Sequence, residues 1–205
     1  MRRAYKVAPV DAVQVEYNPW QLDIENETGT HLLATCRELG VTVFAYSPLG
    51  RGFLTGQIRS RDDFAADDFR RMLPRFNEEN FPKNLELVDV LQTIATKKGV
   101  LLSFPLLFAP APSALAVMDI CLTLNTIGYT AGQLALAWLV AQGNDIVPIP
   151  GTKKIKYLEE NVGAAQVKLS AEEVAEIRTL LESIVIAGAR APSGFFDEYA
   201  DSPAL

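Results

Sequence analysis

The chain has 205 residues, and its 25 acidic side chains outnumber 19 basic ones, which gives a formal net charge of −6. Hydrophobic residues make up 49% and charged residues 21%, a balance that excludes a disordered acidic chain. The acidic excess argues against a nucleic-acid partner, which needs clustered Lys and Arg. One histidine and two cysteines do not form a zinc site, so we expect no metal. With no apolar segment behind the basic N-terminus, a soluble cytoplasmic protein is expected.

Three short apolar segments have the character of β-strands. They span residues 12–17, 42–46 and 145–150, and each is rich in β-branched or aromatic residues and runs into Pro or Gly. The first two begin thirty residues apart, a normal βα repeat. Strands that alternate with helical patterns predict βαβ units and a parallel sheet. Three parallel strands leave two edges and one face uncovered, so we expect part of a larger α/β architecture.

Helical patterns lie between and after these strands. Residues 31–39 end at Gly40, and the apolar spacing of residues 85–95 continues through two lysines to Gly99, where we expect that helix to stop. Capping boxes at Thr130 and Ser170, each with Gln or Glu three residues later, open two further helices. A shorter helical segment follows the last strand over residues 155–161.

Residues 100–128 form an apolar stretch with one charged side chain, Asp119. Three prolines and several polar residues interrupt it, so a membrane span is not favoured. The absence of helical periodicity disfavours a buried core element as well. The flanking helices join across an ordinary connection if the stretch is removed. We therefore hypothesise that 100–128 is an insertion of translated intron, which sequencing of the mature transcript would test.

Two groups of residues have the chemistry of a binding site. The turn at Gly151, Thr152, Lys153 and Lys154 follows a strand and opens a helix, a typical anion site, although a solvated turn explains it equally well. Gln14 and Glu16 share one face of the first strand, and a glutamine inside a buried strand needs a partner, which could be a ligand carboxamide or another core group.

Tyr46, at the end of its strand, is either a core residue or a platform for a flat ring. His31 and the acidic residues between 62 and 68 are interpreted as surface groups. The glycines at 50, 52 and 56 have the wrong spacing for a Rossmann fingerprint.

In combination, these segments resemble the C-terminal half of an aldo-keto reductase, closest to the fungal and plant-like branch with Tyr-Ser-Pro-Leu-Gly. The resemblance rests on Val13 to Asn18, Ala45 to Gly56, Pro74 to Phe76, Gln133 to Trp138, Pro148 to Lys153 and Leu158 to Asn161. It implies that residues 1–205, apart from the insertion, are part of a (β/α)8 TIM barrel, with the three strands as strands six to eight.

The resemblance also implies an NADP(H) site and a small carbonyl substrate. Gln14 would contact the nicotinamide carboxamide and Tyr46 would stack on the ring. The pyrophosphate would lie along Ser47, Leu49 and Gly50. The 2′-phosphate would lie at Gly151, Thr152, Lys153 and Lys154, with Glu160 and Asn161 near the adenine. The segment 57–82 would be a flap over the cofactor, and residues 190–205 would shape the substrate pocket.

No residue of this chain matches the family's catalytic Asp, Tyr, Lys and His, so we assign no catalytic residue. The chain is then expected to be a truncated NADP-dependent reductase without activity of its own. Three alternatives stay open: a non-catalytic nucleotide-binding or interaction protein, a membrane-associated product that uses residues 100–128, and an unstable product of a faulty gene model with exposed sheet edges.

Overall fold

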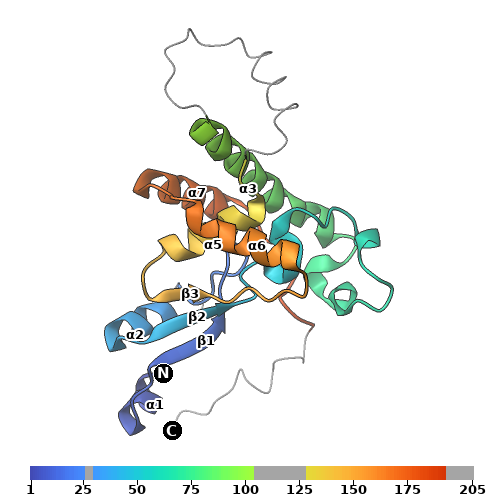
Figure 1. Ribbon diagram of the computed structural model, residues 1–205. Helices are drawn as coiled ribbons and strands as arrows, with labels where there is room; N and C mark the ends of the chain where they lie inside the picture. Colours follow the sequence, from blue (N-terminus) through green and yellow to red (C-terminus); the bar gives the residue numbers. More distant parts are fainter. Residues whose placement is uncertain (26–29, 104–127, 193–205) are drawn as a thin grey trace, which may run out of the picture.

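A computed structural model describes residues 1–25, 30–103 and 128–192 (Figure 1). Its centre is a three-stranded parallel sheet in the order β1-β2-β3, formed by Ala12–Glu16, Thr42–Tyr46 and Ile146–Pro148. The predicted α/β class and the parallel pairing of these segments are confirmed. The second strand has the predicted bounds, whereas β1 stops one residue early, at Glu16, and β3 is the shorter segment Ile146–Pro148.

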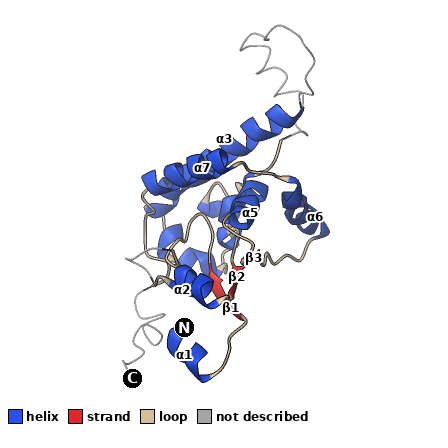
Figure 2. Cartoon of the chain, turned by 90° about the vertical axis from the view of Figure 1, so that its left-hand side faces the viewer, coloured by secondary structure: helices blue, strands red, loops and turns tan. Residues whose placement is uncertain are grey.

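Most of the helices lie on one side of this sheet (Figures 1 and 2). The α-helices are α1 (Arg2–Val7), α2 (Leu32–Leu39), α3 (Asn80–Ser103), α5 (Ala131–Ala141), α6 (Ile155–Gly163) and α7 (Ala171–Ser183). The 3₁₀ turns are η1 (Gly50–Thr55), η2 (Arg61–Asp63), η3 (Phe69–Met72), η4 (Pro74–Phe76) and η5 (Ala164–Gln166).

Local capping signals set several of these boundaries. The Thr130 and Ser170 hydroxyls each accept from the backbone N–H three residues on, and both predicted capping boxes are confirmed. Gly40 ends α2 in the left-handed conformation, as predicted, while His31 precedes the helix as its N-cap. The predicted stop at Gly99 is wrong, because α3 continues to Ser103. One glycine costs a helix only about 1 kcal/mol, which does not by itself end it.

The two faces of the sheet have different surroundings. Val43, Ala45 and Ile146 are buried on one face, and the buried side chains of α5 belong to the same hydrophobic core. Gln14 and Val147 are exposed and belong to the alternate positions of their strands, which point to the opposite face. Among the described residues this second face has no helical layer, which is the uncovered face expected for three parallel strands.

A cluster of aromatic rings anchors the long segment after η1. Trp20 stacks on Phe53 with ring centroids 4.5 Å apart, and Phe76 and Phe81 contact Phe53 edge-on. Phe64 packs edge-on against Phe76. The segment 57–82 therefore consists of three short 3₁₀ turns followed by the start of α3, and the buried rings hold it in place.

Most of the predicted insertion lies outside the described residues, since only 100–103 and 128 are placed. Its origin stays a prediction. In the described part of the chain, no helix is both long and apolar enough to span a bilayer.

Candidate functional site

A cleft of about 700 Å³ opens between the loop after β2 and the start of α6. Ligand-binding clefts commonly measure about 300–1,000 Å³. Its lining comes from two parts of the chain that are distant in the sequence. The first part, between residues 47 and 70, provides Ser47, Pro48, Leu49, Arg51, Gly52, Thr55, Gln57, Ile58, Asp63 and Arg70. The second provides Pro150, Gly151, Thr152, Lys154, Tyr157, Glu160 and Asn161.

A buried asparagine fixes the turn at the end of β2. The Asn18 side chain is fully buried; its Nδ2 donates to the Ser47 carbonyl at 2.9 Å, and its Oδ1 accepts from the Trp20 amide at 2.8 Å. Ser47 itself has a positive φ of 48°, an uncommon conformation for a residue other than glycine. The loop after β1 thus fixes the C-terminal end of β2, which forms one edge of the cleft.

The next turn depends on glycine. Gly50, Arg51 and Gly52 follow one another with φ of 57°, 57° and 90°. A Cβ at Gly50 would lie 3.0 Å from Cε3 of Trp20, so this glycine also permits close packing against the ring. Gly50 is buried and does not itself line the cleft, but its turn sets the positions of Leu49 and Arg51, which do.

The opposite wall is the turn that leads into α6. The Thr152 hydroxyl accepts from the Lys154 amide at 3.1 Å and closes the turn, and α6 starts at Ile155. Farther along the helix, Glu160 Oε1 accepts from the Thr130 hydroxyl at 2.8 Å. The Glu160 carbonyl accepts from Gln133 Nε2 at 3.1 Å. The capping residues of α5 thereby fix α6 beside the cleft.

Three cationic side chains line the cleft: Arg51, Arg70 and Lys154. Arg70 is held by Asp68, with Nη2 and Oδ2 2.6 Å apart, and it donates to the Arg51 carbonyl at 2.7 Å. The Arg70 hydrogen bond holds the pKa of Asp68 below its ordinary value. Lys154 is solvent-exposed, with its Nζ 5.5 Å from the centre of the Tyr157 ring. These groups, with the backbone amides at the α6 start, suit an extended anionic ligand.

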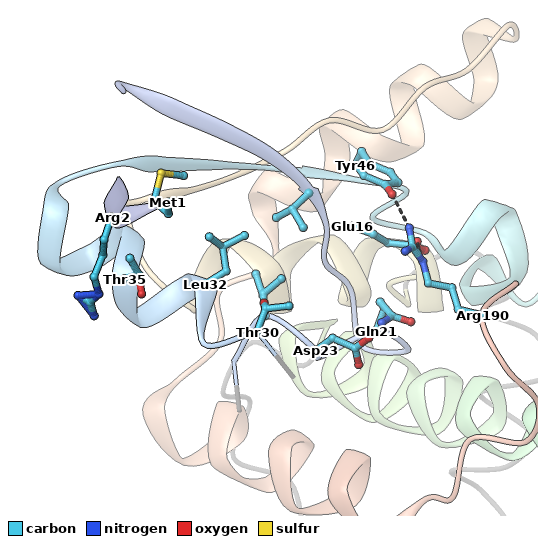
Figure 3. Close-up of a pocket in the computed structure, with 12 residues that line it drawn as sticks. Met1, Arg2, Glu16, Gln21, Asp23, Thr30, Leu32, Thr35, Tyr46 and Arg190 are labelled. Carbon is cyan, nitrogen blue, oxygen red and sulfur yellow. Dashed lines mark hydrogen bonds and ion pairs between the residues drawn. The ribbon is translucent and has the colours of Figure 1, made fainter. Parts of the chain in front are cut away.

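A second cavity, of about 430 Å³, lies along β1 and α2 (Figure 3). Arg190 reaches it from the C-terminal segment, donating to the Tyr46 hydroxyl and pairing with Glu16. Glu16 is buried, and Arg51 Nη2 lies 3.8 Å from its Oε2. Tyr46 thus faces this second cavity. The Glu16 carboxylate contacts both Arg190, which lines the second cavity, and Arg51, which lines the cleft.

The structure brings most of the predicted site residues together. The cleft contains Ser47, Leu49, Gly151, Thr152, Lys154, Glu160 and Asn161. Gly50 lies behind this lining, and Lys153 is exposed outside it. Tyr46 lines the second cavity, and Gln14 is exposed on the uncovered face of the sheet. The premise that Gln14 is a buried strand residue is therefore wrong, because its side chain points to the face of the sheet that no described helix covers.

Several lining residues were missed from the sequence. Arg51 lies between two glycines already noted, which could have drawn attention to it, while Gln57, Arg70 and Tyr157 have no local signal. No group of three His, Cys, Asp or Glu residues in the described ranges is arranged to hold a metal ion.

Two curated proteins show what the chain is similar to. It is 46% identical over 207 residues to "Aldo-keto reductase yakc [NADP(+)]" of Schizosaccharomyces pombe, matching all of this chain and 52% of that protein. It is 48% identical over 190 residues to "Aldo-keto reductase str7" of Strobilurus tenacellus, matching 93% of this chain and 48% of that protein. The chain thus spans about half the length of these relatives.

The fold is similar to that of a solved glycerol dehydrogenase, AKR11B4 from Gluconobacter oxydans. The TM-score is 0.66 at 23% identity, covering 90% of this chain and 46% of that one. The profile of the Aldo/keto reductase family matches residues 1–105 and 114–182, and the stretch between them lies inside 100–128. Because this match covers most of the sequence, the chain belongs to the aldo/keto reductase family.

Proposed function

We propose that the cleft binds NADP(H), and that the chain is the part of an NADP-dependent aldo-keto reductase barrel that carries strands six to eight. The observation that carries this proposal is the convergence of residues 47–70 and 150–161 on one cleft, whose lining includes the cationic side chains of Arg51, Arg70 and Lys154. The S. pombe relative has NADP(+) in its name, which supports the choice of nucleotide. The Tyr-Ser-Pro-Leu-Gly sequence over residues 46–50 supports the corresponding branch of the family.

Within this proposal the residues of the cleft have distinct tasks. Ser47, Leu49 and the turn at Gly50 carry the pyrophosphate. The turn from Gly151 to Lys154 takes the 2′-phosphate. Of the two adjacent lysines, Lys154 contributes more, because it lines the cleft and Lys153 does not. Glu160 and Asn161 lie near the adenine.

The nicotinamide end is assigned to Gln14 and Tyr46 on the uncovered face of the sheet. In a family member with the complete catalytic tetrad, NADPH would supply the hydride that reduces a small carbonyl compound to an alcohol. The residues of this chain would bind and orient the nucleotide. No residue matches the catalytic tetrad of the family. We therefore propose that the 205-residue chain, located in the cytoplasm, binds the nucleotide without turning it over, which is also the behaviour of a non-catalytic nucleotide-binding protein.

Fluorescence titration of the purified chain tests nucleotide binding, because Trp20 packs behind the cleft turn. We expect saturable quenching by NADPH and weaker binding of NADH. Lys154→Ala should weaken NADPH binding roughly 10-fold, the effect of losing one charge-assisted contact, and leave NADH binding nearly unchanged. Lys156→Ala is the matched control, since Lys156 is exposed on the same helix and does not line the cleft.

Two results would contradict the proposal. Absence of saturable NADPH binding would rule out the nucleotide site. Steady oxidation of NADPH with a simple aldehyde by the isolated chain would show that a catalytic group is present. The origin of 100–128 is tested separately, because a mature transcript that encodes these residues would exclude an intron.

A further inference from the structure

We propose that Arg190 is a positioning residue for the nicotinamide end of the nucleotide site. Its guanidinium holds the Tyr46 side chain in place through the Tyr46 hydroxyl, and the buried carboxylate of Glu16 anchors the guanidinium. The inference rests on the nucleotide site proposed above. It gives a residue of the C-terminal segment a task toward the nucleotide, where the family resemblance implies only a role in the substrate pocket.

Glu16 and Tyr46 are the last residues of β1 and β2, and they are paired in register. Their side chains therefore share one face of the sheet, and Gln14, two residues before Glu16, shares it as well. This is the face to which we assign the nicotinamide. Glu16 is only 6% exposed there, so its carboxylate needs charged or hydrogen-bonding partners.

Arg190 contacts both of these residues. Its Nε donates to Glu16 Oε2 at 2.5 Å, and its Nη2 donates to the Tyr46 hydroxyl (Figure 3). The two contacts use different nitrogens of one planar guanidinium, so the pairing with Glu16 also sets the direction from which Tyr46 is contacted. Tyr46 keeps part of its surface exposed. Because the contact is made at the hydroxyl, it does not use the ring face on which a flat group stacks.

The backbone that leads to Arg190 is fixed as well. Ala187 exchanges two hydrogen bonds of 2.9 Å with the buried side chain of Asn84. Gly188 has a φ of 86° and packs so closely on η4 that an added Cβ would lie 2.8 Å from the Pro74 carbonyl oxygen. Arg190 therefore projects from an anchored segment, and little order remains to be imposed on that segment when the nucleotide binds.

This arrangement predicts where the loss of Arg190 would be felt. A side chain that is already held loses less conformational freedom when a ligand stacks on it. Without the guanidinium, the ligand itself would have to order Tyr46. Arg51, whose Nη2 lies 3.8 Å from Glu16 Oε2, would still face the buried carboxylate. The effect should be confined to the nicotinamide half of the nucleotide, because Arg190 does not line the cleft that we assign to the phosphates.

Calorimetric titration of the purified 205-residue chain with two ligands tests the inference. NADPH carries the nicotinamide, whereas 2′,5′-ADP carries only the adenosine with its two phosphates. Arg190→Lys keeps a positive charge beside Glu16 but loses the planar fork that reaches two groups. It should weaken NADPH binding about 2- to 10-fold, the effect of having to order one side chain on binding. Binding of 2′,5′-ADP should stay unchanged.

Tyr46→Phe provides a second variant, because it removes the hydroxyl and keeps the ring. It should weaken NADPH binding to a similar extent, and adding Arg190→Lys to it should have no further effect, since the two residues act as a unit. Arg37→Lys is the matched control. Arg37 forms an ion pair with Asp145 at 2.9 Å and lines neither cavity, so its substitution should leave both affinities unchanged.

The two ligands separate failure of this inference from failure of the nucleotide site. Unchanged NADPH binding by Arg190→Lys would overturn the positioning role and leave the nucleotide site intact. Equal weakening of NADPH and 2′,5′-ADP binding would overturn it as well, because a general structural role affects both ligands. Absence of 2′,5′-ADP binding to the unaltered chain would contradict the proposed nucleotide site itself, and the positioning role with it.

Discussion

The Tyr157 hydroxyl donates a hydrogen bond of 2.8 Å to the Gln57 side-chain oxygen, joining α6 to the loop after β2. Both residues line the cleft, and they come from opposite walls of it. The bond therefore bridges the cleft that we assign to the nucleotide.

Tyr157→Phe removes this bridge and keeps the ring. We expect NADPH to dissociate about 2- to 10-fold faster, since a hydrogen bond of this kind contributes roughly 0.5–1.5 kcal/mol. Stopped-flow fluorescence measures the rate. Tyr129→Phe is the control, because the Tyr129 hydroxyl contacts the Gln166 carbonyl at 3.4 Å and does not line the cleft. Equal dissociation rates for Tyr157→Phe and the unaltered chain would show that the Tyr157–Gln57 hydrogen bond does not slow the release of NADPH.

Gly50→Ala should destabilise the fold. An alanine there must adopt a φ of 57°, and its Cβ would lie 3.0 Å from the buried Trp20 ring. The left-handed conformation alone costs about 1–2 kcal/mol. Urea unfolding should show a loss of at least that size. Gly151→Ala, where an added Cβ has open space, should unfold at nearly the same urea concentration as the unaltered chain.

Asn84 connects three chain segments. From α3, its fully buried side chain donates to the carbonyls of Arg75 and Ala187 and accepts from the Ala187 amide at 2.9 Å. Asn84→Ala leaves these backbone groups without their partner, at a cost of about 3 kcal/mol. Thermal unfolding measures the loss. Asn144→Ala, at an exposed position, should change the melting temperature little, and a similar effect of the two substitutions would refute the connecting role of Asn84.

The Asp68–Arg70 pair predicts a pH dependence of stability. Its hydrogen bond lowers the pKa of Asp68 in the folded chain, so folding favours the ionised carboxylate. The stabilisation is complete above the ordinary Asp pKa of about 3.9 and is lost as the pH falls through the lower folded pKa. Asp68→Asn should therefore destabilise the chain at pH 7, with a difference that shrinks toward pH 3.

Denaturant unfolding at several pH values measures this difference. Asp67→Asn, at the exposed neighbouring position, is the control and should show little change at any pH. A destabilisation by Asp68→Asn that grows as the pH falls would have the wrong sign for the proposed ion pair.

Interactions between residues that are close together in the sequence determined many of the local elements of this protein. The three strands, both capping boxes, the Gly40 helix end and the turn at Gly151 each depend on neighbouring residues, and the sequence predicts all of them. Motif resemblance then identified seven residues that line one cleft. Gly99 shows the limit of local signals, because α3 continues through it.

The tertiary structure alone decided which charged side chains line the cleft. Arg70 reaches the cleft because Asp68 orients it and Phe64 packs beneath its guanidinium, 4.5 Å away. Arg190 meets Tyr46 across 144 residues. Lys154 lines the cleft and the adjacent Lys153 does not. These outcomes depend on how distant aromatic and ionic groups pack together, and spacing along the chain carries no information about that packing.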